Sequence, residues 1–136
     1  MIRALEISGS ALSAQRTRMD VIAGNMANAF TTVQEDGRNE PYRRRTVSFA
    51  AGDGSGNAGV HVFEVAEDPS QFRLQYDPGN PQALRTGPYA GYVRYPNVNL
   101  SMEYVDAMEA ARAYEANLAL MNVSRDMTKQ AVQLLA

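Results

Sequence analysis

Apolar side chains recur at every seventh position near the start of the chain. Leu5, Leu12, Met19 and Met26 form this line, and Ile22 widens it. A seven-residue apolar repeat is typical of a helix that packs along another helix. Glycines within the same stretch each lower the helix propensity by about 1 kcal/mol relative to alanine. We therefore predict a helix over about residues 2–29 that needs a partner to be stable.

The end of the chain repeats this pattern over residues 100–136. One apolar line has seven-residue spacing and consists of Ala113, Leu120, Met127 and Leu134. Ala116 and Val123 lie between these residues at the three–four spacing of a helix. A second line consists of Tyr104, Ala111 and Leu118. Two apolar lines on one helix predict more than one neighbouring helix. Ser101 is the expected N-cap of this helix, which would be roughly 50 Å long.

The middle of the chain has a different period. Residues 42–49, 60–65 and 72–76 show the alternation of short strands, and turns rich in glycine, proline and asparagine separate them. This region has few large apolar side chains, which predicts a small β subdomain rather than a second large core. The predicted fold is α+β. Residues 1–30 form a helix, residues 31–99 a β-rich and irregular middle region, and residues 100–136 a helix that pairs with the first as a coiled-coil-like core.

Composition and charge narrow the possible chemistry. The chain has a net charge of −2, no cysteine and one histidine, His61. A chain without cysteine has no disulfide framework, thiolate zinc site or cysteine nucleophile, and one histidine in a predicted strand is a poor basis for a catalytic triad. The weak net charge gives no reason to expect nucleic acid as a partner. Polar residues interrupt the first apolar stretch, so we expect neither a cleaved secretory signal nor insertion into a membrane.

Loop motifs in the middle resemble ligand sites but lack their structural context. Residues 54–59 match the GxGxxG pattern, yet a strand rather than a helix is predicted to follow them. Asp53, Ser55, Asn57 and Glu64 occupy ligand positions of a calcium loop, yet Ala58 stands where that loop needs glycine. The arginines at positions 43–45 alternate between the faces of a predicted strand and so do not form one basic patch. We therefore predict no cofactor, no metal site and no enzymatic activity.

The sequence resembles a known family at both ends. Residues 10–29, SALSAQRTRMDVIAGNMANA, resemble the signature of flagellar rod and hook proteins, which share an SA-x-Q…N-x-A-N pattern. Residues 108–117, MEAARAYEAN, and the helix after them are similar to the closing helix of that family. The segments PYRRR (41–45), EDPS (67–70), YDPGNP (76–81) and GYVRYPNVN (91–99) resemble the short proximal-rod members. Together these matches cover most of the chain.

The resemblance implies a structural subunit of the bacterial flagellar basal-body rod, which self-assembles into a hollow axial shaft and contributes to motility. Implied partners are other rod proteins, copies of itself, the basal-body ring or adaptor proteins and the flagellar type III export apparatus. The implied location is the periplasmic rod, reached by export without a cleaved signal peptide. Asn25 and Asn28 are the polar members of the motif, and we expect them to make interhelix hydrogen bonds. The residues expected to carry assembly are Leu5, Leu12, Met19, Ile22, Asn25, Met26, Asn28, Leu118, Leu120, Val123, Met127 and Leu134.

Two alternatives remain open at this point. One is another short proximal-rod protein of the same family. The other, from a different class, is a soluble coiled-coil adaptor with a β insert. The adaptor would be a stable, folded monomer or dimer with protected terminal helices, whereas a rod subunit would have frayed termini until it assembles.

Overall fold

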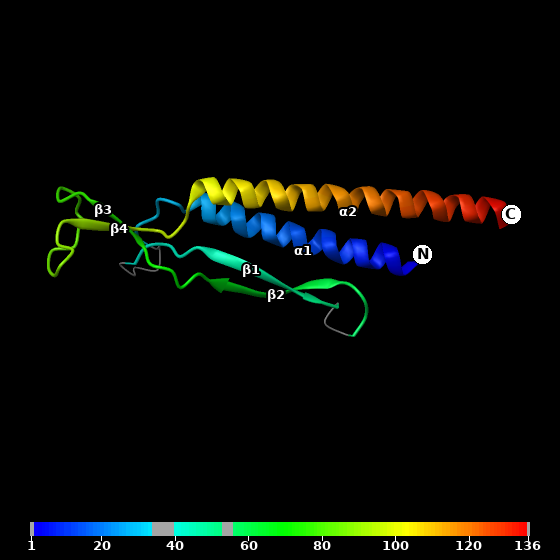
Figure 1. Ribbon diagram of the computed structural model, residues 1–136, viewed down its shortest axis with the longest axis horizontal. Coiled ribbons are helices and arrows are strands. Elements are labelled where there is room, and N and C mark those ends of the chain that lie inside the picture. Colours follow the sequence, from blue (N-terminus) through cyan, green and yellow to red (C-terminus); the bar gives the residue numbers. More distant parts are fainter. Residues whose placement is uncertain (1, 34–39, 53–55, 136) are drawn as a thin grey trace.

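The computed structural model describes residues 2–33, 40–52 and 56–135, and the chain forms an elongated molecule (Figure 1). Helix α1 (Ile2–Ala27) and helix α2 (Leu100–Leu135) lie antiparallel and side by side. Strands β1 (Arg45–Ala51) and β2 (Val60–Glu67) form a ribbon along the side of α1 that faces away from α2. Strands β3 (Arg73–Tyr76) and β4 (Tyr92–Tyr95) form a hairpin at the opposite end from the termini. The α+β fold with paired terminal helices is confirmed.

The two helices pair through small and polar side chains rather than through the large apolar lines. The less exposed positions of α2 repeat every seven residues, at Glu103, Ala110, Asn117, Ser124 and Ala131, with Ala107, Tyr114, Met121 and Thr128 between them. The buried residues of α1 include Ser8, Ala14 and Ile22. A Cβ added at Gly9 would lie 3.8 Å from the Met121 side chain, so the helices approach closely there. Small residues at the contact permit such an approach.

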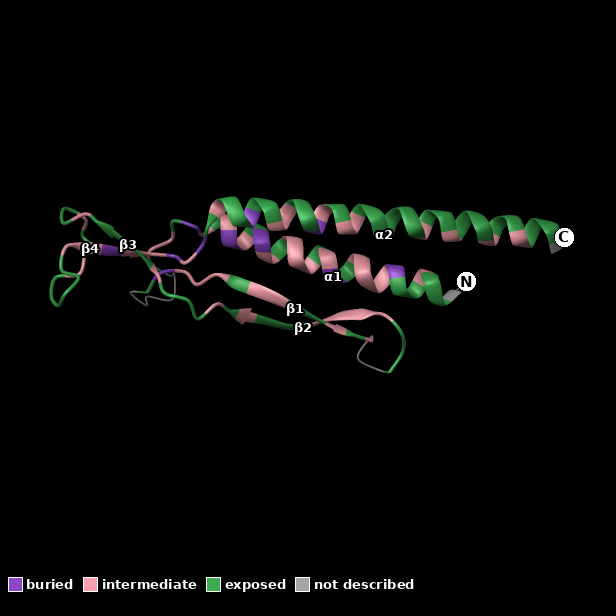
Figure 2. Ribbon diagram, in the orientation of Figure 1, coloured by how far each residue is buried: buried purple, intermediate pink, exposed green. Residues whose placement is uncertain are grey.

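The core is thin and concentrates where the end of α1 meets the start of α2 (Figure 2). Ala29, Val93, Val98 and Ala110 are at most 1% exposed. Beyond this region α2 continues past the N-terminus of α1, and its outer side is exposed along its whole length (Figure 2). A subunit with so little buried apolar surface gains little free energy from its own packing.

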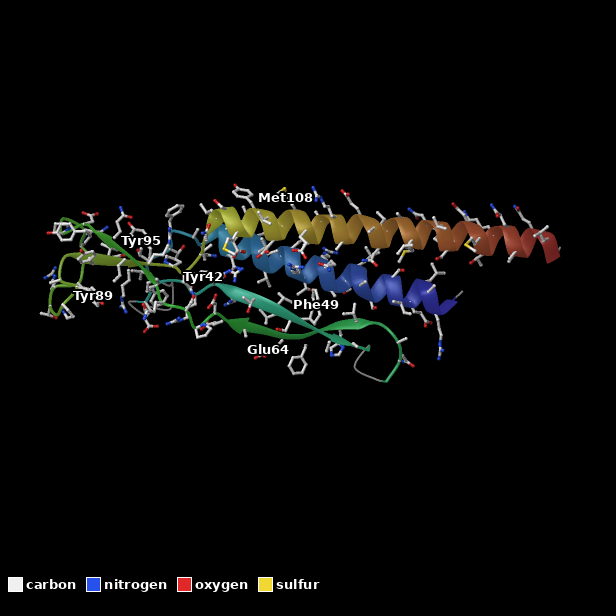
Figure 3. All side chains as sticks on the ribbon, in the orientation of Figure 1. Tyr42, Phe49, Glu64, Tyr89, Tyr95 and Met108 are labelled. Atoms are coloured by element: carbon white, nitrogen blue, oxygen red, sulfur yellow. The ribbon has the colours of Figure 1, made fainter. Side chains whose placement is uncertain are left out.

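The β1–β2 ribbon has an inner and an outer face. Val47 pairs with Val65, and Phe49 pairs with Val62. Figure 3 shows Phe49 on the face turned toward α1 and Glu64 on the other face. The ribbon tip is attached to α1, because the backbone N–H of Val60 donates to the Ser10 hydroxyl at 3.1 Å. The ribbon therefore covers α1 on one side while α2 covers it on the other.

The structure corrects our boundaries in the middle region and at the start of α2. β1 begins at Arg45 rather than at Tyr42, because the N–H groups of Tyr42 and Arg44 donate to Thr31 and Asn97 instead of to β2. Strand β4 was not predicted as a strand. Ser101 is not the N-cap of α2: the Asn99 side chain accepts from the N–H groups of Ser101 and Met102, which is the N-cap role.

Candidate assembly interface

Asn25 is the centre of a polar junction between α1, β1 and α2. Its side chain is 1% exposed. Its Nδ2 donates to the Arg45 carbonyl at 2.8 Å and to Glu103 Oε2 at 3.2 Å. Its Oδ1 accepts from the Arg45 N–H at 2.8 Å and from the Tyr42 hydroxyl at 3.0 Å. Both ends of the amide are thus satisfied, and one side chain fixes a strand and a second helix relative to α1.

Glu103 and Arg44 form the charged part of this junction. Glu103 is fully buried, and its second oxygen accepts a hydrogen bond from Arg44 Nε. Arg44 also reaches Asp106 at 3.2 Å and Asp68 at 3.6 Å. A buried carboxylate without a partner would cost several kcal/mol, so Arg44 is what makes Glu103 tolerable at the helix contact. Removing Arg44 would leave Glu103 as a buried charge without its ion-pair partner.

The local pKa values follow from these contacts. Burial alone would lower the pKa of Arg44, but its hydrogen bond to Glu103 and the charges of Glu103, Asp106 and Asp68 together raise it. The backbone N–H and the hydroxyl of Ser70 lower the pKa of Asp68, and Arg44 adds to this effect. Burial raises the pKa of the Tyr42 phenol. Every shift favours the protonation state that the junction needs at neutral pH, so the junction is a structural element.

The second region of interest is the outer side of α2. Four of the predicted assembly residues form a line there and are exposed: Leu120 at 59%, Val123 at 56%, Met127 at 55% and Leu134 at 88%. Leu118 is 41% exposed. The antiparallel partner within the subunit, α1, lies on the other side of α2 (Figure 2). The large apolar side chains of α2 are therefore free to contact another molecule.

The predicted residues of α1 lie in a different environment. Ile22 is buried, and Leu5, Leu12, Met19 and Met26 are half-buried. The exposed line of α1 instead includes Ser13, Arg16, Asp20 and Ala23. The structure therefore does not bring the predicted α1 and α2 residues together into one surface.

Asn25 and Asn28 behave differently. Asn25 makes an interhelix hydrogen bond to Glu103. The Asn28 side chain instead donates to the Gly24 carbonyl at 2.9 Å and accepts from the Thr31 hydroxyl at 3.2 Å. Asn28 thus closes the C-terminal end of its own helix, and these two hydrogen bonds are local rather than interhelix.

The described residues can be compared with the requirements of a metal site, of the two loop motifs and of a membrane-spanning helix. Among those residues no group of three or more histidine, aspartate or glutamate side chains could hold a metal ion. Asp53, Gly54 and Ser55, which belong to the two loop motifs, lie outside the described residues. The His61 ring lies 2.8 Å from the Gly52 carbonyl at the base of that loop. No helix within the described ranges is both long and apolar enough to cross a membrane.

Sequence reasoning missed most of the polar junction. Glu103 and Arg44 are separated by 59 residues in the chain, and no local pattern links them. One signal was available: Glu103 lies seven residues before Ala110, on the small-residue line of α2, where a carboxylate needs a buried partner. The arginine run at 43–45 could have supplied that partner.

Comparison with known proteins identifies relatives over nearly the full chain. The family model described as Flagella basal body rod protein matches residues 5–33, and the model described as Flagellar basal body rod FlgEFG protein C-terminal matches residues 89–134. The flagellar basal-body rod protein FlgC of Bacillus subtilis is 42% identical, with 96% of this chain and 95% of the relative aligned. FlgC of Borreliella burgdorferi is 37% identical, with 99% and 97% aligned. FlgC of Yersinia enterocolitica is 40% identical, with 98% and 97% aligned.

Proposed function

This chain belongs to the FlgC family of flagellar basal-body rod proteins, and we propose that it builds the proximal rod by packing the outer side of α2 against neighbouring subunits. The family relation makes it a structural subunit of the basal body and a contributor to flagellum-dependent motility. Its relatives are structural rod proteins, and we extend this to the chain itself as a protein without catalytic activity.

One observation carries the assembly proposal. Leu120, Val123 and Met127 are large apolar side chains, and each is more than half exposed. An exposed apolar line on a helix marks a surface for contact with another molecule, and a second helix can match its seven-residue spacing. The α1 contact already uses the opposite side of α2, so the partner that covers this line belongs to another molecule.

Neighbouring copies of this chain and other rod proteins are the proposed partners on this surface. The half-buried α1 residues contribute their remaining exposed area to the contact, namely Leu5, Leu12, Met19 and Met26. The junction around Asn25 contributes indirectly, because it holds α1 and α2 in register. Asn28 contributes by ending α1 at a fixed point. The surfaces that meet are different on each subunit, so the contact repeats from copy to copy and generates a helical array.

We further propose that the chain reaches the periplasmic part of the basal body through the flagellar type III export apparatus, without cleavage of a signal peptide. The family relation supports this route. The thin core also suits export, since a subunit that gains little from its own packing is easily unfolded. The mass of the intact chain recovered from basal bodies tests the absence of cleavage.

The decisive experiment compares purified basal bodies with the soluble fraction of the source bacterium by quantitative mass spectrometry. The proposal requires enrichment of this chain in the basal bodies. Detection solely in the soluble fraction of cells that build flagella would contradict it and would favour a soluble coiled-coil adaptor.

A substitution then tests the α2 surface itself. Leu120→Asp should change the subunit's own free energy of unfolding by no more than about 0.5 kcal/mol, because Leu120 lies on the surface. It should lower incorporation into basal bodies at least tenfold, because an unpaired carboxylate buried at a helix contact costs several kcal/mol. Asn122→Asp is the matched control, since Asn122 is exposed on another side of α2. Normal incorporation of the Leu120 variant would contradict assembly through this face.

A further inference from the structure

The β1–β2 ribbon carries a strongly exposed aromatic side chain at a β-bulge. Ser48 pairs with Glu64 and Phe49 pairs with Val62, so Phe63 has no cross-strand partner. Phe63 is 69% exposed. A β-bulge changes the direction of a side chain relative to the regular alternation of a strand, and it is treated as a designed feature rather than a defect. We call Phe63 and Glu64 together the hairpin knob.

The start of α2 carries a shallow apolar notch on its outer side. Val105, Met108, Glu109 and Arg112 line an open cavity of about 290 Å³. Val105 and Met108 are 58% and 55% exposed. Since an apolar cavity of roughly 150 Å³ accommodates a benzene ring, this notch has room for one phenyl group. Methionine and the arginine stem adapt readily to an inserted ring.

The charges beside the knob and the notch are complementary. Within the notch, Glu109 lies 3.7 Å from Arg18 and is already paired inside the subunit. Among the described residues, Arg112 and Glu64 have no ion-pair partner within the chain. Arg112 can pair with a carboxylate and can also lie over an aromatic ring. Glu64 and Phe63 offer both groups at adjacent positions.

The knob and the notch lie on opposite sides of the molecule. Figure 3 shows Met108 pointing away from α1 on the α2 side and Glu64 pointing away from α1 on the β2 side. In this view both stand at a similar position along the long axis. The whole of α1 separates them, so they cannot meet within one subunit. A second copy placed beside the first can bring them together without any change of shape.

We infer that the hairpin knob of one copy inserts into the α2 notch of the next copy, with Phe63 between Val105 and Met108 and with Glu64 paired to Arg112. The inference rests on the proposed function, because it names a second copy as a partner of α2. The contact is heterologous and repeats from copy to copy. The notch is continuous with the exposed line of Leu120, Val123 and Met127, since Val105, Arg112 and Val123 lie on one side of α2. The knob alone is too small to hold two subunits together, and it instead fixes their register along that line.

A disulfide between copies tests this contact directly. The chain has no cysteine, so a variant with Glu64→Cys and Arg112→Cys contains only the two introduced thiols. A disulfide needs Cα atoms within roughly 7 Å, which the opposite placement excludes inside one subunit. The double variant replaces the native chain in the flagellated source bacterium, and purified basal bodies are oxidised and analysed on non-reducing gels. The matched control pairs Glu64→Cys with Gln130→Cys, which stands on the same side of α2 roughly 27 Å further along.

We expect a ladder of covalent multimers on the gel. It should be at least tenfold stronger for the variant with Glu64→Cys and Arg112→Cys than for the variant with Glu64→Cys and Gln130→Cys. Equal ladders, or none, in basal bodies that contain the chain at its normal level would overturn the knob contact and leave the proposed function intact. A native chain missing from basal bodies would overturn both. If the cysteine variants fail to incorporate, charge reversal decides: Glu64→Arg and Arg112→Glu should each lower incorporation several-fold, and their combination should restore it to within twofold. Failure of the combination to restore incorporation would overturn the pairing.

Discussion

Replacement of Asn25 by alanine should be among the most destabilising single changes in the subunit. The change removes four hydrogen bonds: two to the backbone of Arg45, one to Glu103 and one from Tyr42. Glu103 keeps its bond from Arg44, and the half-buried Tyr42 hydroxyl can turn toward water. The N–H and C=O of Arg45 both lose the Asn25 amide as their hydrogen-bond partner.

The magnitude follows from those two backbone groups. An unsatisfied buried polar group costs about 1–3 kcal/mol, so the two together predict a loss of roughly 2–6 kcal/mol in the free energy of unfolding. Domains of this size are stable by only about 5–15 kcal/mol, so the change removes a large fraction of the total. Urea unfolding followed by circular dichroism measures this loss of unfolding free energy. The m value, which is the slope of that free energy against urea concentration, should be the same for the variant and the native chain.

Asn28→Ala is the matched control, because it removes an asparagine of the same motif whose bonds are local. It should cost about 1 kcal/mol or less. Hydrogen exchange adds an independent measurement, since Asn25→Ala should accelerate exchange at the Arg45 amide specifically. A loss for Asn25→Ala below about 0.5 kcal/mol, or no larger than that for Asn28→Ala, would refute the assignment of Asn25 as the centre of the junction.

Two further predictions concern acid stability and backbone conformation. The pKa of Asp68 is lowered by the Ser70 hydrogen bonds, so its contribution to stability is present above the unfolded value near 3.8 and is lost as the pH falls through the folded value. Below pH 4 the free energy of unfolding should therefore fall less steeply with decreasing pH for Asp68→Asn than for the native chain. The same pH dependence for both proteins in this range would contradict the prediction. Gly91 and Gly87 both have positive φ, at 85° and 92°, but a Cβ at Gly91 would lie 2.8 Å from the Tyr76 ring whereas one at Gly87 meets nothing. Backbone strain should lower the free energy of unfolding of both alanine variants by about 1–2 kcal/mol. Thermal unfolding should show a further loss for Gly91→Ala alone, because of the Tyr76 ring. Equal losses for the two variants would mean that this ring moves aside freely.

The sequence by itself determined the elements at both ends of the chain. The seven-residue apolar repeats and the absence of proline specify two long helices, and the helix bounds were predicted to within about two residues. The family signature in residues 10–29 depends on local side chains and could be read directly. The turn-rich middle likewise had to be short hairpins, because glycine and proline interrupt every longer pattern.

Only the tertiary structure decided which side of α2 meets α1. A periodic pattern shows that a helix has an apolar side, but it does not show which neighbour covers that side. In this subunit the line of small and polar residues from Glu103 to Ala131 packs on α1, and the line through Leu120 and Met127 stays exposed. Small residues let two backbones approach closely, which leaves the large side chains available for contacts between molecules.

The tertiary structure also decided the role of Asn25. An asparagine in a helix could face water, cap a turn or bond a neighbouring element, and its own sequence context fits all three. The outcome depends on Arg44 and Glu103, which are remote from it in the chain and reach it only when β1 and α2 have packed on α1. Hydrogen bonds between distant segments form after the chain has been brought together, so local sequence patterns do not encode them.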